Sequence, residues 1–111
     1  MVTRILMLVA AALLITISAS FVVATSAYTF DDTFERGAAA YQRGNYPAAY
    51  KHWHSLAERG NARAQSKLGS LYINGRGVAQ NYVEAVRWYG KAAEQGDIEA
   101  QNNLGVLYFN G

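Results

Sequence analysis

The strongest constraint on the fold of this chain is a repeat of 36 residues in its C-terminal half. Nine of the sixteen positions in residues 60–75 recur in residues 96–111, where chance would give about one. The recurring pairs are Gly60/Gly96, Ala64/Ala100, Gln65/Gln101, Leu68/Leu104, Gly69/Gly105, Leu71/Leu107, Tyr72/Tyr108, Asn74/Asn110 and Gly75/Gly111. Such a period is typical of proteins that stack copies of one small unit, because a single copy cannot bury its apolar face alone.

The repeated residues have the spacing of an amphipathic helix. Ala64, Leu68 and Tyr72 are four positions apart, which places them on one helix face. Asn61 and Asp97 each follow a glycine and stand where a helix N-cap is expected. A second kind of helix, with alanines and aromatic residues on one face, is predicted between these copies and before them.

The spacing predicts five helices, over residues 32–43, 47–59, 62–74, 82–95 and 98–109. The expected fold class is all-α, an alpha-alpha superhelix of about two and a half helix pairs within residues 28–111. The first turn is predicted to be about five residues shorter than the loop after Gly75. Gly69 and Gly105 lie in mid-helix, where glycine costs roughly 1 kcal/mol relative to alanine, so we expect a neighbouring helix to approach each of them closely.

The first 27 residues differ in composition from the rest of the chain. Residues 5–24 contain no charged side chain, and a helix of that length would span roughly 30 Å, the thickness of a bilayer core. Two interpretations stay open: a signal peptide cleaved after Ala24 or Ala27, or an uncleaved membrane anchor over residues 5–24. Arg4 predicts a cytoplasmic N-terminus, so we expect the repeats to be exported, and periplasmic or secreted if cleaved.

Residues 64–96 resemble the Sel-one-like repeat, a relative of the tetratricopeptide repeat. The motif in this chain is Ala64-Gln65-x-x-Leu68-Gly69-x-Leu71-Tyr72-x-x-Gly75-x-Gly77-Val78-x-Gln80-x-Tyr82-x-x-Ala85-x-x-Trp88-Tyr89-x-Lys91-Ala92-Ala93-x-Gln95-Gly96. Residues 34–60 are more similar to an ordinary tetratricopeptide unit. The resemblance implies a non-enzymatic scaffold that binds proteins or peptides along a concave face in the bacterial envelope. The chain has no cysteine, so it departs from the cysteine-rich members.

The inward faces of the first, third and fifth predicted helices are the expected protein-binding surface. Such a face, polar with a few apolar anchors, suits peptide binding. The candidate residues are Arg43, Arg63, Ser66, Ser70, Ile73, Asn74, Asn102, Val106, Phe109 and Asn110, with Asp32, Glu35, Ala39, Gln42 and Glu99 on the same faces.

Other classes of function find little support. The net charge of +2 is spread without a basic run, which argues against nucleic acid. His52 and His54 point about 200° apart on a helix and cannot share a metal, so we expect no metal site and no cofactor. The tryptophans and tyrosines stand at helical spacing, so we expect them to pack between helices. Gly75-Arg76-Gly77 lacks the lysine of a phosphate loop and is interpreted as a turn.

Two alternatives to a free scaffold remain. The first is a membrane-tethered regulator, in which the N-terminal helix is retained and the repeats sense a partner. The second is a small cell-wall hydrolase that uses the neighbourhood of His52, His54 and Glu58. The last predicted helix ends at Gly111 without a covering helix, which leads us to expect a fragment of a longer protein or self-association through this helix.

Overall fold

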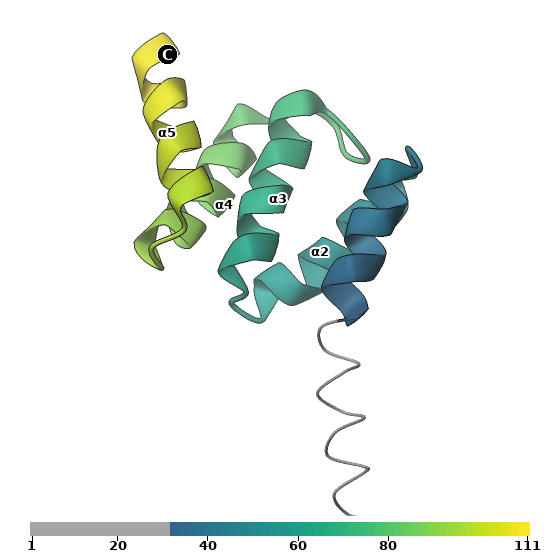
Figure 1. The fold of residues 1–111 in the computed structure, drawn as a ribbon. Helices are drawn as coiled ribbons and strands as arrows, with labels where there is room; N and C mark the ends of the chain where they lie inside the picture. Colours follow the sequence, from purple (N-terminus) through teal and green to yellow (C-terminus); the bar gives the residue numbers. More distant parts are fainter. Residues whose placement is uncertain (1–31) are drawn as a thin grey trace, which may run out of the picture. The chain divides into compact units, whose positions relative to one another are not determined.

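The computed structural model describes residues 32–111, which form helices joined by turns (Figure 1). A helix over residues 32–42 is followed by α2 (Tyr46–Glu58), α3 (Ala62–Asn74), α4 (Tyr82–Glu94) and α5 (Ile98–Asn110). These bounds differ from the predicted ones by at most one residue. No strand occurs within residues 32–111, which confirms the all-α prediction for this part of the chain.

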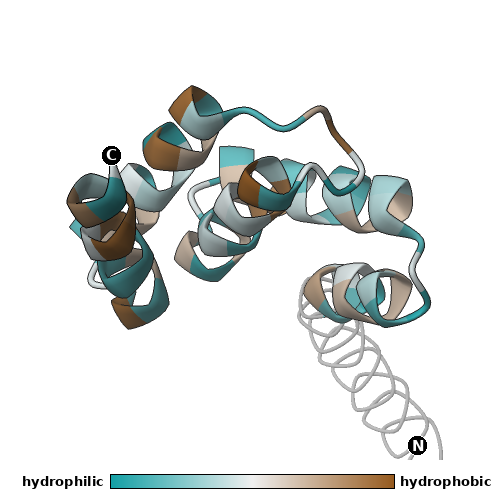
Figure 2. Ribbon diagram, turned by 90° about the horizontal axis from the view of Figure 1, so that it is seen from above, coloured by the Kyte–Doolittle hydropathy of each residue, from teal (hydrophilic) through white to brown (hydrophobic). Residues whose placement is uncertain are grey.

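The predicted signal peptide or anchor, residues 1–27, lies outside the described residues and stays a prediction. Within residues 32–111, none of the helices combines the length and the apolar character that crossing a bilayer requires. Each of these helices carries both polar and apolar residues (Figure 2), as expected for helices that cover a core with one face and expose the other.

Side-chain caps begin the four labelled helices. The Asn61 side chain accepts a hydrogen bond of 2.9 Å from the backbone N–H of Ala64. Asp97 does the same, at 2.8 Å, for Ala100. Each cap satisfies one of the N–H groups that the first turn of a helix leaves without a partner. Both predicted caps are confirmed, and the complete set is Asn45, Asn61, Asn81 and Asp97.

The two copies of the repeat turn in the same way. Gly60 and Gly96 have φ angles of 93° and 91°, in the left-handed region that residues with a Cβ atom rarely adopt. Each donates its backbone N–H to a carbonyl three residues earlier, Ala57 at 3.0 Å and Ala93 at 2.9 Å. Each turn reverses the direction of the chain within three residues. As a result α3 packs against α2, and α5 packs against α4.

Two adjacent clusters of buried side chains form the core. The first contains Phe34, Trp53, Leu68 and Trp88, and so joins the helix over 32–42, α2, α3 and α4. The second joins α3, α4 and α5 around alanines and Tyr89. Tyr72 packs against both clusters. Each helix pair therefore buries its apolar face against the next pair, as the repeat interpretation requires.

A repeated glutamine links the units. Gln65 donates its side-chain N–H to the carbonyl of Ala57 at 3.1 Å, and Gln101 donates to Ala93 at 3.2 Å. The two bonds are 36 residues apart at both ends. Gln65 is buried and also accepts a hydrogen bond of 2.9 Å from Gln95. A buried amide needs such partners, which explains the glutamine at position 65, whereas Gln101 makes the equivalent bond from an exposed position.

The mid-helix glycines differ in their surroundings. A Cβ atom built on Gly69 would lie 2.7 Å from ring atoms of Tyr89, so the expected close approach is confirmed there. At Gly105 no described atom lies within 4 Å of the corresponding point. The expectation is therefore wrong for Gly105, because no described helix packs on that side of α5.

The turns between helices differ in length, as predicted. Residues 43–45 separate the first helix from α2, whereas residues 75–81 separate α3 from α4, so the difference is four residues rather than five. Arg76 of the longer loop donates a hydrogen bond to the hydroxyl of Tyr41 and stacks 5.1 Å from the ring centroid of Tyr46. The stretch Gly75-Arg76-Gly77 is a turn, as expected, and it anchors the loop to the first helix pair.

Candidate functional site

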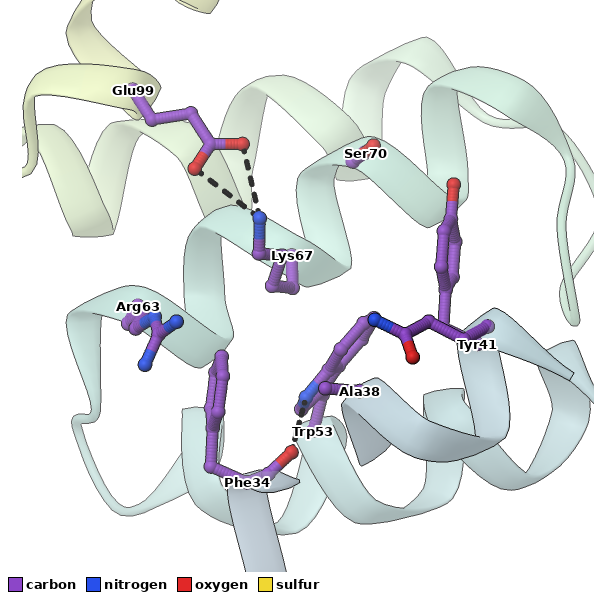
Figure 3. Close-up of a pocket in the computed structure, with 9 residues that line it drawn as sticks. Phe34, Ala38, Tyr41, Trp53, Arg63, Lys67, Ser70 and Glu99 are labelled. Atoms are coloured by element: carbon purple, nitrogen blue, oxygen red, sulfur yellow. Dashed lines mark hydrogen bonds and ion pairs between the residues drawn. The ribbon is translucent and has the colours of Figure 1, made fainter. Parts of the chain in front are cut away.

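A cleft of about 440 Å³ opens between helices of successive units (Figure 3). Its residues come chiefly from the first helix and α3, with one residue each from α2 and α5. The first helix, α3 and α5 are the helices whose faces were predicted to bind a partner. The lining residues are Phe34, Ala38, Tyr41, Gln42, Trp53, Arg63, Lys67, Ser70 and Glu99. The volume lies within the range of about 300–1,000 Å³ that is typical of ligand sites.

Aromatic rings form one wall of the cleft. Trp53, from α2, is buried and donates its indole N–H to the carbonyl oxygen of Phe34 at 3.2 Å. Its ring centroid lies 5.8 Å from those of both Phe34 and Tyr41. These separations suit favourable aromatic packing. Arg76, in the α3–α4 loop, also donates a hydrogen bond to the Tyr41 hydroxyl. These contacts within the chain hold the aromatic side chains in position without a bound partner.

Charged side chains form the opposite wall. Arg63 and Lys67 are one helical turn apart on α3, and Glu99 belongs to α5. The Arg63 guanidinium carbon lies 4.1 Å from the centroid of the Phe34 ring, an attractive cation–π arrangement. The Lys67 ammonium lies 3.3 Å from a carboxylate oxygen of Glu99. The cleft therefore combines an apolar wall with two cations and one carboxylate (Figure 3).

The structure brings two of the predicted binding residues together in the cleft, Arg63 and Ser70. Gln42 and Glu99, which the sequence placed on the same faces, join them there. Lys67 was missed, although its spacing of four residues from Arg63 predicts a shared helix face. Tyr41 and Trp53 were expected to pack between helices, and they do so while also lining the cleft together with Phe34.

Seven predicted binding residues lie elsewhere. Six are exposed but outside the cleft: Arg43, Asn74, Asn102, Val106, Phe109 and Asn110. Ile73 is half-buried and packs against the second core cluster. The Asn74 amide donates to the Ser70 carbonyl at 3.0 Å, within its own helix. Whether these seven contact a partner stays a prediction.

The placement of Ser66 on the exposed face is wrong. Its side chain has no exposed surface, because α3 stands in the middle of the stack and packs against α2, α4 and α5. Only part of the circumference of such a helix remains open. The equivalent residue of α5, Asn102, is exposed, so the same repeat position is inside in one unit and outside in the next.

The histidines lie away from the cleft. His54 stacks on Tyr50, with 5.2 Å between ring centroids, and meets the edge of Trp88 at 6.0 Å. Its Nε2 lies 3.4 Å from a carboxylate oxygen of Glu58. Within residues 32–111, no three His, Asp or Glu side chains gather closely enough to hold a metal ion. Trp53 and Trp88 are both buried in the core, which confirms their predicted packing role.

The pKa shifts of Tyr72 and Glu84 have different origins, a contact between neighbouring units and an ion pair within α4. Burial, and then the hydrogen bond of 3.1 Å with the Tyr50 hydroxyl, raise the pKa of Tyr72 to about 12. A hydrogen bond from Arg87 lowers the pKa of Glu84 below its ordinary value. Neither Tyr72 nor Glu84 lines the cleft. We attribute both shifts to the packing of the helices and to surface ion pairing rather than to a chemical role.

A second hollow of about 390 Å³ lies at the end of the described stack, lined by Tyr82, Val86, Leu107, Asn110 and Gly111. Large apolar side chains are exposed on the same two helices, with Phe109 at 91% and Val83 at 77% of their full accessibility. Exposed large apolar side chains are a feature of association sites when they gather in one patch. The self-association predicted for the last helix stays a prediction.

The chain was compared with models of protein families and with curated proteins. The Sel1 repeat model matches residues 33–61, 62–97 and 98–111, which together make up more than two thirds of the chain. No curated protein matches it. Sel1 repeats generally mediate protein–protein interaction and typically bind protein partners. Three consecutive matches, on helices that stack in register, show that this chain belongs to the Sel1 repeat family.

Proposed function

We propose that this chain is a non-enzymatic scaffold that holds an extended segment of a partner protein in the cleft between the first helix, α3 and α5. The observation that carries the proposal is the cleft itself, in which residues of three successive units meet. Its aromatic wall offers apolar contact, and its polar wall offers donors that fix the orientation of a bound chain. No nucleic acid and no cofactor is part of this proposal.

The cleft suits a flexible segment better than a folded domain. Its polar groups come from three helices and lie beside the aromatic wall: Gln42, Arg63, Lys67, Ser70 and Glu99. A segment lying across them would bury side chains on one side and expose the other to solvent. A few buried side chains usually contribute most of the binding energy of such contacts. We expect those side chains of the partner to bind at the aromatic wall.

Replacing Gln42 by Trp is expected to abolish peptide binding by filling the cleft. Gln42 is exposed and lines the cleft edge, so the larger ring would occupy it without disturbing the core. The 111-residue chain would be used to select binders from a display library of random peptides. The selected peptides should bind the variant at least about tenfold more weakly than the unaltered chain.

Val83→Trp is the matched control for this experiment. Val83 is an exposed position on α4, 77% accessible, and does not line the cleft. This variant should retain full peptide binding. If the library yields no binder, or if Gln42→Trp binds as well as Val83→Trp, the proposed binding site is wrong.

We further propose that the scaffold works on the far side of a bacterial membrane, in the periplasm or beyond. Support comes from the sequence of residues 1–27, with Arg4 followed by twenty uncharged residues. Mass spectrometry of the mature protein should find an N-terminus near Thr25 or Tyr28. An intact Met1 would favour the alternative, a repeat protein tethered to the membrane that senses its partner there.

A further inference from the structure

We propose that the cleft recognises a carboxylate beside an apolar side chain in the partner segment, and that Glu99 occupies the carboxylate position until the partner arrives. This inference rests on the proposed function and adds the chemistry of the partner. Arg63 and Lys67 would bind the carboxylate, while Phe34 and Tyr41 would contact the apolar neighbour. All four residues line the cleft (Figure 3).

Arg63 has unused binding capacity. Its guanidinium lies over the Phe34 ring, and within residues 32–111 it forms no ion pair or hydrogen bond. A guanidinium carries five N–H donors in its own plane, so contact with a ring through its face leaves these donors for a ligand. Planar carboxylates match them in geometry and charge.

Lys67 already holds a carboxylate. Its ammonium lies 3.3 Å and 3.4 Å from the two carboxylate oxygens of Glu99, which comes from the next unit. The side chains are 31% and 51% accessible, and ion pairs this exposed contribute little to stability. A partner carboxylate can therefore replace that of Glu99 at small cost and be shared between Lys67 and Arg63.

The charges favour an acidic partner over a basic one. With Glu99 displaced, two cations remain in the cleft lining, one helical turn apart. The opposite wall consists of Phe34, Ala38, Tyr41 and Trp53, which offers no charge to a basic segment. Complementary charge mainly selects the partner and steers its approach, and the aromatic wall then selects the residue next to the carboxylate.

The test is fluorescence anisotropy with the 111-residue chain and labelled peptides that differ at one position. One peptide carries phenylalanine followed by glutamate, and a second carries phenylalanine followed by glutamine. A third has phenylalanine as its last residue with a free terminal carboxylate, which separates a side-chain source from a terminal one. At least one carboxylate peptide should bind about tenfold or more tightly than the glutamine peptide.

Variants of the chain assign the effect to residues. Arg63→Gln and Lys67→Gln should each weaken binding of the carboxylate peptide by about tenfold, and leave the weak binding of the glutamine peptide unchanged. Glu99→Gln should strengthen binding severalfold by freeing Lys67. Lys91→Gln is the matched control, because Lys91 lies over Trp88 on α4, outside the cleft, and should leave both affinities unchanged.

Equal affinities for all three peptides would overturn the inference, as would absence of binding by all three. An equal loss in Lys91→Gln would also overturn it, since net charge alone would then explain the effect. A weakening in Glu99→Gln would refute the role given to Glu99. If library peptides without acidic residues bind and are blocked by Gln42→Trp, this inference fails while the proposed function stands.

Discussion

Replacing Leu68 by Ala should lower the free energy of unfolding by about 2–5 kcal/mol, the usual range for a fully buried leucine. Leu68 has no exposed surface and lies in the first core cluster, between the first helix pair and the second. A unit of this size has a total stability of roughly 4–12 kcal/mol, so the variant should lose a large share of it. Urea denaturation followed by circular dichroism measures the loss.

Leu104→Ala provides the matched control, because Leu104 occupies the equivalent position one repeat later. It is half-buried rather than fully buried, at the edge of the second cluster. Its replacement leaves less of a cavity, since solvent can fill the space, and should cost less than half as much as Leu68→Ala. Equal losses at the two positions would mean that Leu104 is covered as completely as Leu68, contrary to the structure.

Gly69→Ala and Gly105→Ala should change stability in opposite directions. At Gly69 the added methyl would meet the ring of Tyr89 at 2.7 Å, and Tyr89 is itself buried and unable to move freely. Overpacking of this kind costs about 1–3 kcal/mol, which outweighs a gain of up to roughly 1 kcal/mol in helix propensity. The variant should unfold at lower urea concentration than the unaltered chain.

At Gly105 only the gain in helix propensity applies. No described atom lies within 4 Å of the added methyl, so Gly105→Ala should be stabilising by about 0.5–1 kcal/mol. The same urea experiment compares the two variants. Destabilisation by both substitutions would show that a helix covers α5 in solution at the place where Tyr89 covers α3.

The repeat was enough to predict the helices because the caps and turns that begin and end them depend on residues close together in sequence. Asn and Asp cap a helix wherever they stand just before a helical pattern. Asn61 and Asp97 do so here by accepting a hydrogen bond from a backbone N–H only three residues away. The turns at Gly60 and Gly96 likewise depend on local backbone geometry. Both features repeat in the structure as they do in the sequence.

The binding surface was harder to predict because burial depends on position within the stack. Ser66 and Asn102 are equivalent in the repeat, yet one is buried and the other is exposed. The sequence pattern of a single helix shows which face is apolar, but not how many neighbours enclose it. The helix α3 has neighbours on several sides, whereas α5 is covered mainly by α4.

The side-chain contacts between units could not be predicted from the sequence either. The pairing of Lys67 with Glu99 joins residues 32 positions apart, a separation set by the crossing of α3 and α5 rather than by the repeat period. Arg76, in the α3–α4 loop, likewise bonds to a residue distant in sequence, Tyr41 of the first helix. Such pairs can be predicted only when the packing of the helices is known, and they determine the shape of the cleft.

Amide chemical shifts of the 111-residue chain, followed while a peptide selected for binding is added, test the central claim most directly. We expect the largest changes at Gln42, Arg63, Lys67 and Glu99, which three successive units bring to one cleft. Changes confined to the exposed end of the stack, around Val106 and Phe109, would contradict this assignment and place the binding surface on α5 instead.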